Sequence, residues 1–378
     1  MTSLDGPSSP LALHTRARAL VSAFSAGAPP PESFDALACD LARYQAARIE
    51  GYERLCRARG LDLAALSSAV DIPAVPTDAF KMTRVATFSL EETTTTFRTS
   101  GTTIGARGEH PMRDVATYDA AAVAFGRQWL ARDLDRPVPV VVLGPSPTQA
   151  PDSSLVHMCE AFVRAFGTPG SDASTYLIDA DGILDLAAFD ERVAIALARS
   201  EPMLVLGTSF AFVHFVDGVG KASFDLPRGS RVMQTGGYKG RSREVPPAVL
   251  RADLARVFAL DQRSIVGEYG MTELSSQFYE RTLFDDASPV GVYAEPPWAR
   301  VVPVDPDTLA PVSHGEIGIA KILDLMNVES AVAVLTEDQV RRVGAADAGG
   351  FELLGRAPGA PARGCSIAID ELLGRAGG

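Results

Sequence analysis

Hydroxyl groups and glycines are concentrated in residues 97–110, which read Phe-Arg-Thr-Ser-Gly-Thr-Thr-Ile-Gly-Ala-Arg-Gly-Glu-His. Backbone N–H groups at such glycines, the hydroxyl groups and the guanidinium of Arg107 can all donate hydrogen bonds to an oligophosphate. The stretch lacks the GxxxxGK[ST] pattern of a P-loop and the GxGxxG pattern of a dinucleotide site. By itself it predicts either a phosphate-binding loop or a solvated turn between two strands.

A second stretch, residues 266–274, brings an aromatic ring, a glycine, a hydroxyl group and a carboxylate within five residues of one another. A carboxylate next to phosphate-binding hydroxyl groups suits Mg²⁺, which usually takes one or two carboxylates together with phosphate oxygens. Taken separately, Tyr269 and Met271 are more typical of a protein core and Glu273 of a protein surface. The two stretches become informative when they are considered together.

Together they resemble the adenylate-forming superfamily of acyl-CoA synthetases and adenylation domains. Ser-Gly-Thr-Thr at residues 100–103 is followed by Tyr-Gly-Met-Thr-Glu at residues 269–273. Leu-Thr-Glu-Asp at residues 335–338 is similar to the superfamily's Thr-Gly-Asp, with Glu337 in place of glycine, and Gly355-Arg356 is similar to its hinge element. The order and spacing of these motifs agree over residues 75–364.

The resemblance implies that a carboxylic acid attacks the α-phosphorus of ATP, giving acyl-AMP and pyrophosphate. Arg107 and Thr272 would act at the phosphates and Glu273 would bind Mg²⁺. Tyr269 would lie against the adenine, and Asp338 would bind the ribose with help from Arg356. The implied nucleotide-binding residues are Ser100, Gly101, Thr102, Thr103, Gly236, Gly237, Tyr269, Gly270, Met271, Asp338 and Arg356.

The sequence departs from the superfamily in two places. The phosphate loop has Ile104, Ala106 and Arg107 where glycine, proline and lysine are usual, and Arg107 keeps the charge without the compact ammonium group. Superfamily members also carry a mobile C-terminal domain with a catalytic lysine, whereas 22 residues without a lysine follow Arg356 here. We therefore expect this domain, and the thioester-forming rotation that it performs, to be absent or vestigial.

One subfamily ends near this length, the LuxE-type acyl-protein synthetases of bacterial luminescence. The chain is similar to them at residues 72–81, 236–240 and 363–366. They carry the activated acyl group on a cysteine near the C-terminus, and Cys365 occupies that place. Arg363 would lower the pKa of this thiol, with Gly364 as a flexible neighbour. The alternative is that Cys365 is a small buried residue at the start of a strand over residues 366–369.

The predicted function is that of an AMP-forming acid–thiol ligase of the acyl-protein synthetase type, with ATP and Mg²⁺ as cofactors. It activates a carboxylic acid, expected to be a fatty acid, and loads it on Cys365 for an acyl-accepting reductase or transferase. In the first alternative, coenzyme A or a carrier-protein thiol receives the acyl group and Cys365 is structural. The second is a cysteine-dependent thioester hydrolase using a histidine such as His314. The third is a nucleotide-binding partner protein without catalysis.

Apolar periodicity predicts the elements that position these residues. Continuous apolar runs at residues 138–143 and 203–206 are typical of strands buried on both faces, and residues 153–166 and 186–199 of helices. This alternation indicates an α/β fold. Loops beyond the carboxyl ends of such strands form pocket walls, so the candidate acyl-binding residues are Thr208, Phe210, Phe212 and His214.

We expect the fold of the N-terminal domain of adenylate-forming enzymes, with mixed sheets flanked by helices. Residues 1–74 form a helical segment packed on the core, and residues 75–287 form the α/β core that binds nucleotide and acyl group. Residues 288–378 form a smaller β-rich portion with a truncated C-terminal tail. Proline-rich, strand-like runs after about residue 288 support the last part.

Composition excludes several classes of protein. The 378 residues include 35 Lys+Arg and 47 Asp+Glu, a net charge of −12 that disfavours general nucleic-acid binding. No apolar run approaches the roughly 20 residues that span a bilayer, so we expect a cytoplasmic protein without membrane association. The four cysteines are far apart and form no CxxC pair, which predicts free thiols and no local zinc site.

Overall fold

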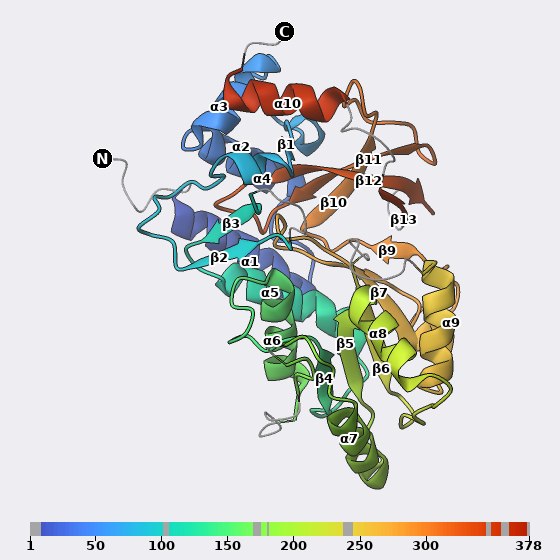
Figure 1. Cartoon of the computed structure of the whole chain (residues 1–378). Coiled ribbons are helices and arrows are strands. Elements are labelled where there is room, and N and C mark those ends of the chain that lie inside the picture. The colour runs from blue at the N-terminus through green and yellow to red at the C-terminus, as the bar shows by residue number, and fades with distance from the viewer. Residues whose placement is uncertain are drawn as a thin grey trace. The chain divides into compact units, whose positions relative to one another are not determined.

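The structure is a computed structural model that describes residues 9–100, 106–168, 175–179, 181–236, 245–344, 349–356 and 363–375. The chain forms two compact α/β units (Figure 1). Unit 1 comprises Met1–Ala124, Met271–Gln277 and Ala294–Gly378, and unit 2 comprises Phe125–Gly270 and Phe278–Tyr293. The three-part division that we drew at residues 74 and 287 stays a prediction.

The N-terminal part of unit 1 is helical, as the sequence predicts. Ser9 and Ser33 cap the first two helices, each accepting a hydrogen bond from the backbone three residues later. The helical elements of unit 1 up to the unit boundary are α1 (Pro10–Ser25), α2 (Phe34–Ala46), α3 (Glu50–Ala58), a 3-10 turn (Ala69–Asp71), α4 (Ala79–Met82) and α5 (Ala116–Gly126), the last of which crosses that boundary. No helix among the described residues combines the length and apolar character needed to cross a membrane.

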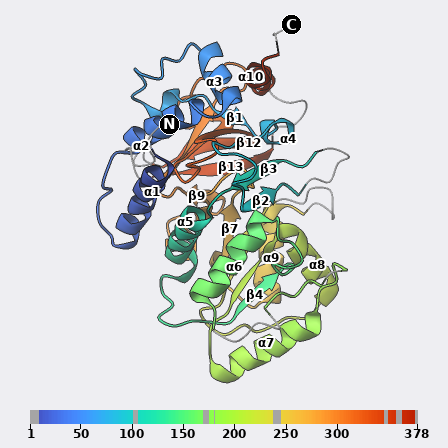
Figure 2. The ribbon, with the colours of Figure 1, turned by 90° about the vertical axis from the view of Figure 1, so that its left-hand side faces the viewer.

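The C-terminal part of unit 1 is built on an antiparallel sheet, which confirms the strands expected there. Neighbouring strands follow chain order, and β1 (Val75–Pro76) adds to β12 in parallel. The antiparallel strands are β10 (Ala299–Val304), β11 (Ile317–Asp324), β12 (Ala333–Val343) and β13 (Gly350–Arg356). A separate hairpin, β2 (Thr95–Arg98) and β3 (Glu109–Met112), carries the stretch rich in hydroxyl groups (Figure 2).

The prediction of a strand over residues 366–369 is wrong, because they belong to helix α10 (Arg363–Leu373). Its buried side chains recur at intervals of three and four, the period of a helix: Cys365, Ala368, Ile369 and Leu372. Arg54 Nε of α3 donates to the carbonyl of Leu372 at 3.0 Å. Helix α10, red in Figure 1, therefore packs beside the N-terminal helix α3.

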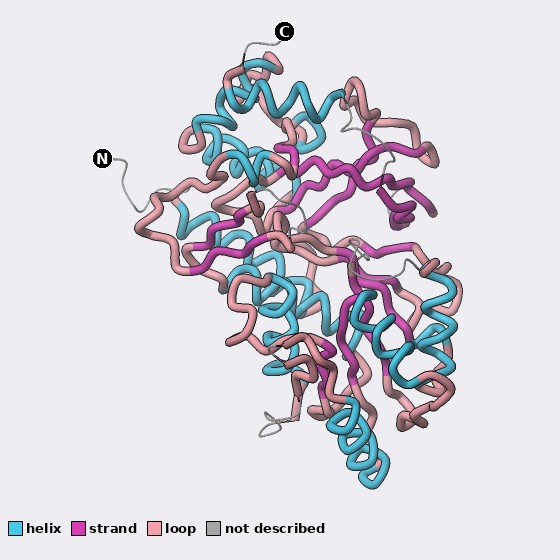
Figure 3. Tube along the Cα trace, in the orientation of Figure 1, coloured by secondary structure: helices cyan, strands magenta, loops and turns pink. Residues whose placement is uncertain are grey.

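Unit 2 contains a parallel sheet that the sequence predicts in part. Four parallel strands, among those drawn in magenta in Figure 3, run side by side. Strand β8 (Phe278–Glu280) pairs antiparallel with the last of them. The parallel strands are β4 (Val140–Leu143), β5 (Leu204–Thr208), β6 (Arg231–Thr235) and β7 (Ile265–Tyr269). The other elements are a π-helical turn (Arg127–Ala131), α6 (Ser154–Phe166), α7 (Leu186–Arg199), α8 (Ser209–Val219), α9 (Pro247–Val257), a 3-10 turn (Gln262–Ser264) and β9 (Val292–Ala294), whose last residue belongs to unit 1.

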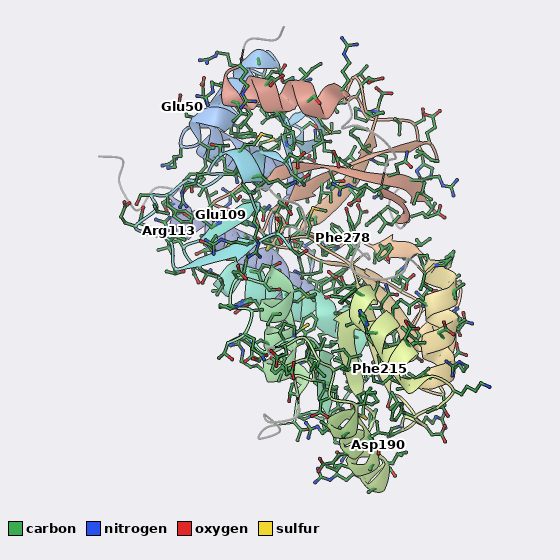
Figure 4. All side chains as sticks on the ribbon, in the orientation of Figure 1. Glu50, Glu109, Arg113, Asp190, Phe215 and Phe278 are labelled. Atoms are coloured by element: carbon green, nitrogen blue, oxygen red, sulfur yellow. The ribbon has the colours of Figure 1, made fainter. Side chains whose placement is uncertain are left out.

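Aromatic rings fill the core of unit 2. Phe189 and Phe215, the latter labelled in Figure 4, meet edge to face with ring centroids 4.8 Å apart. Phe212 and Phe258 belong to the same cluster. Phe212, a candidate acyl-binding residue, is thus fully buried in a packed apolar core.

Candidate functional site

The base of the stretch rich in hydroxyl groups is a tight hairpin in unit 1. Thr99 N donates to the carbonyl of Gly108, and Gly108 N donates to Thr99 Oγ1, both at 2.9 Å. Arg107 Nε donates to the carbonyl of Thr99 at 2.6 Å, so this exposed guanidinium lies along its own hairpin. Ser100 is exposed at the edge of the loop. Gly101, Thr102, Thr103 and the variant position Ile104 lie outside the described residues.

The motif Thr272-Glu273 lies in a short segment of unit 1, Met271–Gln277, which we call the motif segment. A buried carboxylate, Asp324 at the end of β11, holds the far end of this segment. Its oxygens accept hydrogen bonds from the N–H groups of Ser275 and Ser276 at 2.9 Å and from Ser276 Oγ at 2.6 Å. Burial raises the pKa of Asp324, and these hydrogen bonds oppose that rise.

Two further buried side chains hold consecutive carbonyl groups of the motif segment. His110 Nδ1 of β3 lies 2.7 Å from the carbonyl of Thr272, and Asn327 Nδ2 donates to the carbonyl of Glu273 at 2.9 Å. Since a carbonyl can only accept, the proton of His110 is assigned to Nδ1. Asn327 Oδ1 accepts from Ser275 Oγ at 2.7 Å. Thr272 is partly exposed, whereas Glu273 is 6% exposed.

His110 is neutral at physiological pH. The residue is 0% exposed, and burial lowers its pKa from 6.5 to about 4. Its ring meets Phe80 edge to face, and Nε2 has no hydrogen-bond partner among the described residues. His110, Asn327 and Asp324 are not among the site residues predicted from the sequence. His110 could have been noticed because it follows the loop by two residues, whereas nothing local marks the other two.

The proposed ribose-binding residues lie on neighbouring strands of unit 1. Asp338 of β12 and Arg356 of β13 are cross-strand partners. Arg356 Nη2 lies 2.6 Å from Glu337 Oε2, so the residue that replaces the superfamily's glycine forms an ion pair with this guanidinium. Asp338 is partly exposed, and its backbone N–H donates to Thr336 Oγ1 at 3.0 Å. The structure therefore brings Asp338 and Arg356 together, with Glu337 beside them.

Cys365 lies in the first turn of α10 and is 4% exposed. Burial raises the pKa of the thiol from 9.0 to about 11, and the carboxylates Glu337 and Asp78 raise it further. The expectation that Arg363 activates this thiol is therefore not met, because burial and neighbouring negative charge favour its protonated form.

Gly364 is packed tightly, so the prediction of a flexible residue at this position is wrong. Its N–H donates to the carbonyl of Pro306 at 2.9 Å. A Cβ atom at this position would lie 2.6 Å from that oxygen and 2.7 Å from Leu309 Cδ2. Glycine is thus required for the close approach of α10 to the loop after β10.

Polar groups gather at the carboxyl ends of the parallel strands of unit 2. Ser209 Oγ donates to the carbonyl of Gly236 at 2.6 Å and accepts from Gln234 Nε2 at 2.6 Å. Gly236 has a φ of +70°, a conformation that glycine adopts without strain. Thr235 Oγ1 donates to a carboxylate oxygen of Glu268. Gly237 lies outside the described residues.

Glu268 and Tyr269 end strand β7, and both are buried. Burial raises the pKa of Glu268 from 4.5 to about 7, and the hydrogen bond from Thr235 limits the rise. The ring of Tyr269 lies near those of Phe278 and Tyr293, with centroids 6.0 and 6.2 Å away. Gly270 and Met271, which follow, are partly exposed. Glu268 is not among the site residues predicted from the sequence.

The candidate acyl-binding residues of unit 2 divide between a surface and the core. Thr208 Oγ1 caps α8 by accepting from Ala211 N at 3.1 Å. Phe210 is partly exposed, and its ring lies 4.5 Å from that of His214, which is exposed. Phe212 lies in the aromatic core described above. No group of three or more metal-ligating side chains occurs among the described residues.

Comparison with known families identifies a match along most of the chain. The family model of the acyl-protein synthetase LuxE matches residues 34–374. Two curated proteins, both long-chain-fatty-acid–luciferin-component ligases, are 23% identical to the chain. The protein of Aliivibrio fischeri aligns over 279 residues, 71% of this chain and 68% of its own length. The protein of Vibrio harveyi aligns over 299 residues, 76% of this chain and 74% of its own.

Solved structures with the same fold are acyl-CoA ligases. An open conformation of 2-hydroxyisobutyryl-CoA ligase, in complex with 2-HIB-AMP and CoA, has a TM-score of 0.56 at 12% identity, covering 87% of this chain and 79% of the other. The thioesterification state of that enzyme has a TM-score of 0.59 at 13% identity, covering 90% of this chain and 68% of the other. The expected fold, that of the adenylate-forming ligases, is therefore confirmed.

Proposed function

Because the chain belongs to the LuxE family of acyl-protein synthetases, we propose that it activates a long-chain fatty acid with ATP and loads the acyl group on its own Cys365. Family membership makes it a ligase. The fatty acid is proposed from the names of the two curated relatives. The choice of Cys365 as acceptor goes one step further and is argued from its surroundings.

In the activation step, a carboxylate oxygen of the acid attacks the α-phosphorus of ATP, and pyrophosphate leaves. Thr272 contacts the α-phosphate, and Arg107 and the hydroxyl groups of the loop bind the other phosphates. Support comes from the motif segment, whose carbonyl groups are held by buried donors, so that Thr272 is positioned before substrate binds. Such positioning supplies most of the catalysis in phosphoryl chemistry.

Glu273 fits a Mg²⁺ ion that is bound mainly through nucleotide phosphates. It is a buried carboxylate in a segment fixed by hydrogen bonds, and Mg²⁺ at such sites needs one or two protein carboxylates. When bound, the ion would neutralise part of the phosphate charge. Asp338, with Arg356 beside it, would accept hydrogen bonds from the ribose hydroxyl groups.

In the transfer step, the Cys365 thiolate attacks the carbonyl carbon of acyl-AMP. The C–S bond forms, the C–O bond to the phosphate breaks, AMP leaves and the thiol proton passes to solvent. The observation that carries this proposal is the proximity of Cys365 to Glu337, the neighbour of Asp338 and the ion-pair partner of Arg356. The acceptor thiol thus belongs to the same part of unit 1 as the proposed ribose site. Transfer requires the thiol to become exposed and deprotonated.

Replacing Cys365 with serine tests the proposal. We expect C365S to catalyse ATP–pyrophosphate exchange at the wild-type rate while intact-protein mass spectrometry detects no acyl adduct after incubation with ATP, Mg²⁺ and a fatty acid. C56S is the matched control, because Cys56 of α3 is also buried and its pKa is also raised to about 11. An adduct on C365S, or its loss in C56S, would contradict the assignment of Cys365.

The burial of Cys365 favours a second candidate function, in which acyl-AMP passes to an external thiol of coenzyme A or a carrier protein. A thiol with a raised pKa suits a packing role. In that case C365S would form acyl-CoA or acylated carrier protein as fast as the wild type.

The remaining alternatives have less support. A cysteine hydrolase needs a stabilised thiolate, whereas the pKa of Cys365 is raised, and His314 is an exposed residue of another segment. Thioester hydrolysis without ATP would identify such an enzyme. A non-catalytic nucleotide-binding protein would bind ATP tightly without releasing pyrophosphate.

A further inference from the structure

We propose that His110 is a positioning residue for the activation step, acting through its Nδ1–H hydrogen bond to the carbonyl of Thr272. The inference rests on the proposed function, because it names the residue that orients the phosphate-binding motif. His110 and Thr272 are 162 residues apart in the sequence and both belong to unit 1. Their hydrogen bond joins the hairpin that carries the phosphate loop to the motif segment.

The geometry of two peptide planes explains what this hydrogen bond does. His110 fixes the peptide plane between residues 272 and 273, and Asn327 fixes the plane between residues 273 and 274. Because peptide groups are planar, fixing both planes also fixes the two backbone dihedral angles of Glu273. The carboxylate is then restricted to a few staggered rotamers. Removing either donor lets one peptide plane rotate, so that the side chains of Thr272 and Glu273 lose their fixed orientation.

The burial of His110 favours this role over that of a proton carrier or a metal ligand. The side chain is fully enclosed, Phe80 packs against its ring, and no described residue binds Nε2. A neutral ring supplies one directional donor to a buried carbonyl without adding a buried charge. The depressed pKa of His110 agrees with this state.

The isosteric pair H110N and H110L tests the role. The asparagine Nδ2 group takes the place of the imidazole Nδ1 donor. Leucine has the same branched shape as asparagine but no hydrogen-bond donor. We expect H110L to lower kcat of ATP–pyrophosphate exchange by about 10- to 100-fold with less than about a threefold change in KM for ATP, because displaced catalytic groups cost that much. H110N should stay within about threefold of the wild type.

Equal losses in both variants, following their loss of thermal stability, would mean a merely structural role and would overturn the inference. Wild-type protein without any exchange would instead contradict the proposed function, and the inference with it. Exchange in the wild type with unchanged kinetics in both variants would contradict only the inference. Failure of the proposed function and failure of the inference about His110 therefore give different results.

A measurement on the wild-type protein remains informative if H110L does not fold. The chain has five histidines, so ¹⁵N-histidine NMR spectra can be assigned with single variants. We expect one ring in the Nδ1–H tautomer that is missing from the H110N spectrum and does not titrate between pH 8 and pH 5.5. An Nε2–H tautomer at His110 would overturn the inference.

Discussion

The motif segment and helix α10 belong to the same unit, but they differ in how far their proposed reactive groups are prepared for reaction. In the motif segment, residues Met271–Gln277, buried donors and acceptors hold the backbone on both sides of Glu273. In α10, Cys365 is buried next to the tightly packed Gly364, and burial with the carboxylates Glu337 and Asp78 raises the pKa of its thiol to about 11. The backbone of the first region is fixed by hydrogen bonds, whereas the proposed nucleophile of the second is buried and has a raised pKa.

This difference indicates where the proposed reaction needs a conformational change. Activation depends on preorganised hydrogen bonds, which act without reorganisation at the moment of reaction. Transfer depends on a nucleophile that must first leave an environment raising its pKa. In the proposed mechanism, burial of the protonated thiol would also protect it from other acyl donors and from oxidation until acyl-AMP forms.

The largest expected effect comes from breaking the polar network of the motif segment. Asp324 accepts four hydrogen bonds, and D324N would direct amide hydrogens at groups that are themselves donors. We expect D324N to lower the free energy of unfolding by about 3 kcal/mol, as unpaired buried donors do. Urea denaturation measures this, with D307N in an exposed loop as the matched control. Equal midpoints for the two variants would show that the network contributes little.

A smaller effect is expected in the pH dependence of the free energy of unfolding, to which His110 contributes. The pKa of His110 is 6.5 in the unfolded reference and about 4 in the folded chain, so the unfolded chain binds the proton first as pH falls. Its contribution to stability is present above pH 6.5 and is lost as pH falls toward 4. Between pH 7.5 and pH 5 the loss is about 2 kcal/mol.

The non-titrating variant H110N isolates this contribution. The difference in unfolding free energy between wild type and H110N should change by about 2 kcal/mol over the same pH range. A difference independent of pH would mean that His110 is not held neutral by burial. The titrations of the carboxylates and of the other histidines cancel in this difference, because they occur in both proteins.

The smallest effect concerns the packing of α10. In G364A the added methyl group would meet the Pro306 carbonyl and Leu309, which we expect to cost about 1–2 kcal/mol and to loosen the first turn of the helix. The alkylation rate of Cys365 at pH 8, located by peptide mass mapping, should then rise. S366A is the control, because Ser366 is exposed on the same turn. An unchanged rate in G364A would mean that Gly364 does not keep the thiol buried.

Local sequence patterns predicted several elements well. Residues 186–199 form α7 as expected, and Ser153 caps α6 by accepting from Val156 N. The two apolar runs coincide with the buried strands β4 and β5 over most of their length. The same reasoning failed at residues 366–369, where a short apolar run was interpreted as a strand although its neighbours complete a helical period. A run of four residues is too short to distinguish the two-residue period of a strand from the 3.6-residue period of a helix.

The candidate site was predictable only in its motifs. Residue types marked the hairpin at residues 97–110 and the motif at residues 269–273, because hydroxyl groups, glycines and a carboxylate at short spacing are visible locally. Asn327 and Asp324 are invisible in the same way, since an isolated polar residue becomes a hydrogen-bond partner only when a distant segment is folded against it. The same holds for Glu268, whose raised pKa depends on burial in unit 2.

The sequence by itself determined the order of the motifs, the family, and most helices and strands, because these depend on residue types and on periods of a few residues. Only the tertiary structure decided which ionisable groups are charged and which backbone groups are fixed. The proton of His110 depends on a carbonyl 162 residues away, and that of Cys365 on burial and on Asp78 and Glu337. A pKa reports the free energy of a charge in its surroundings, and folding creates those surroundings.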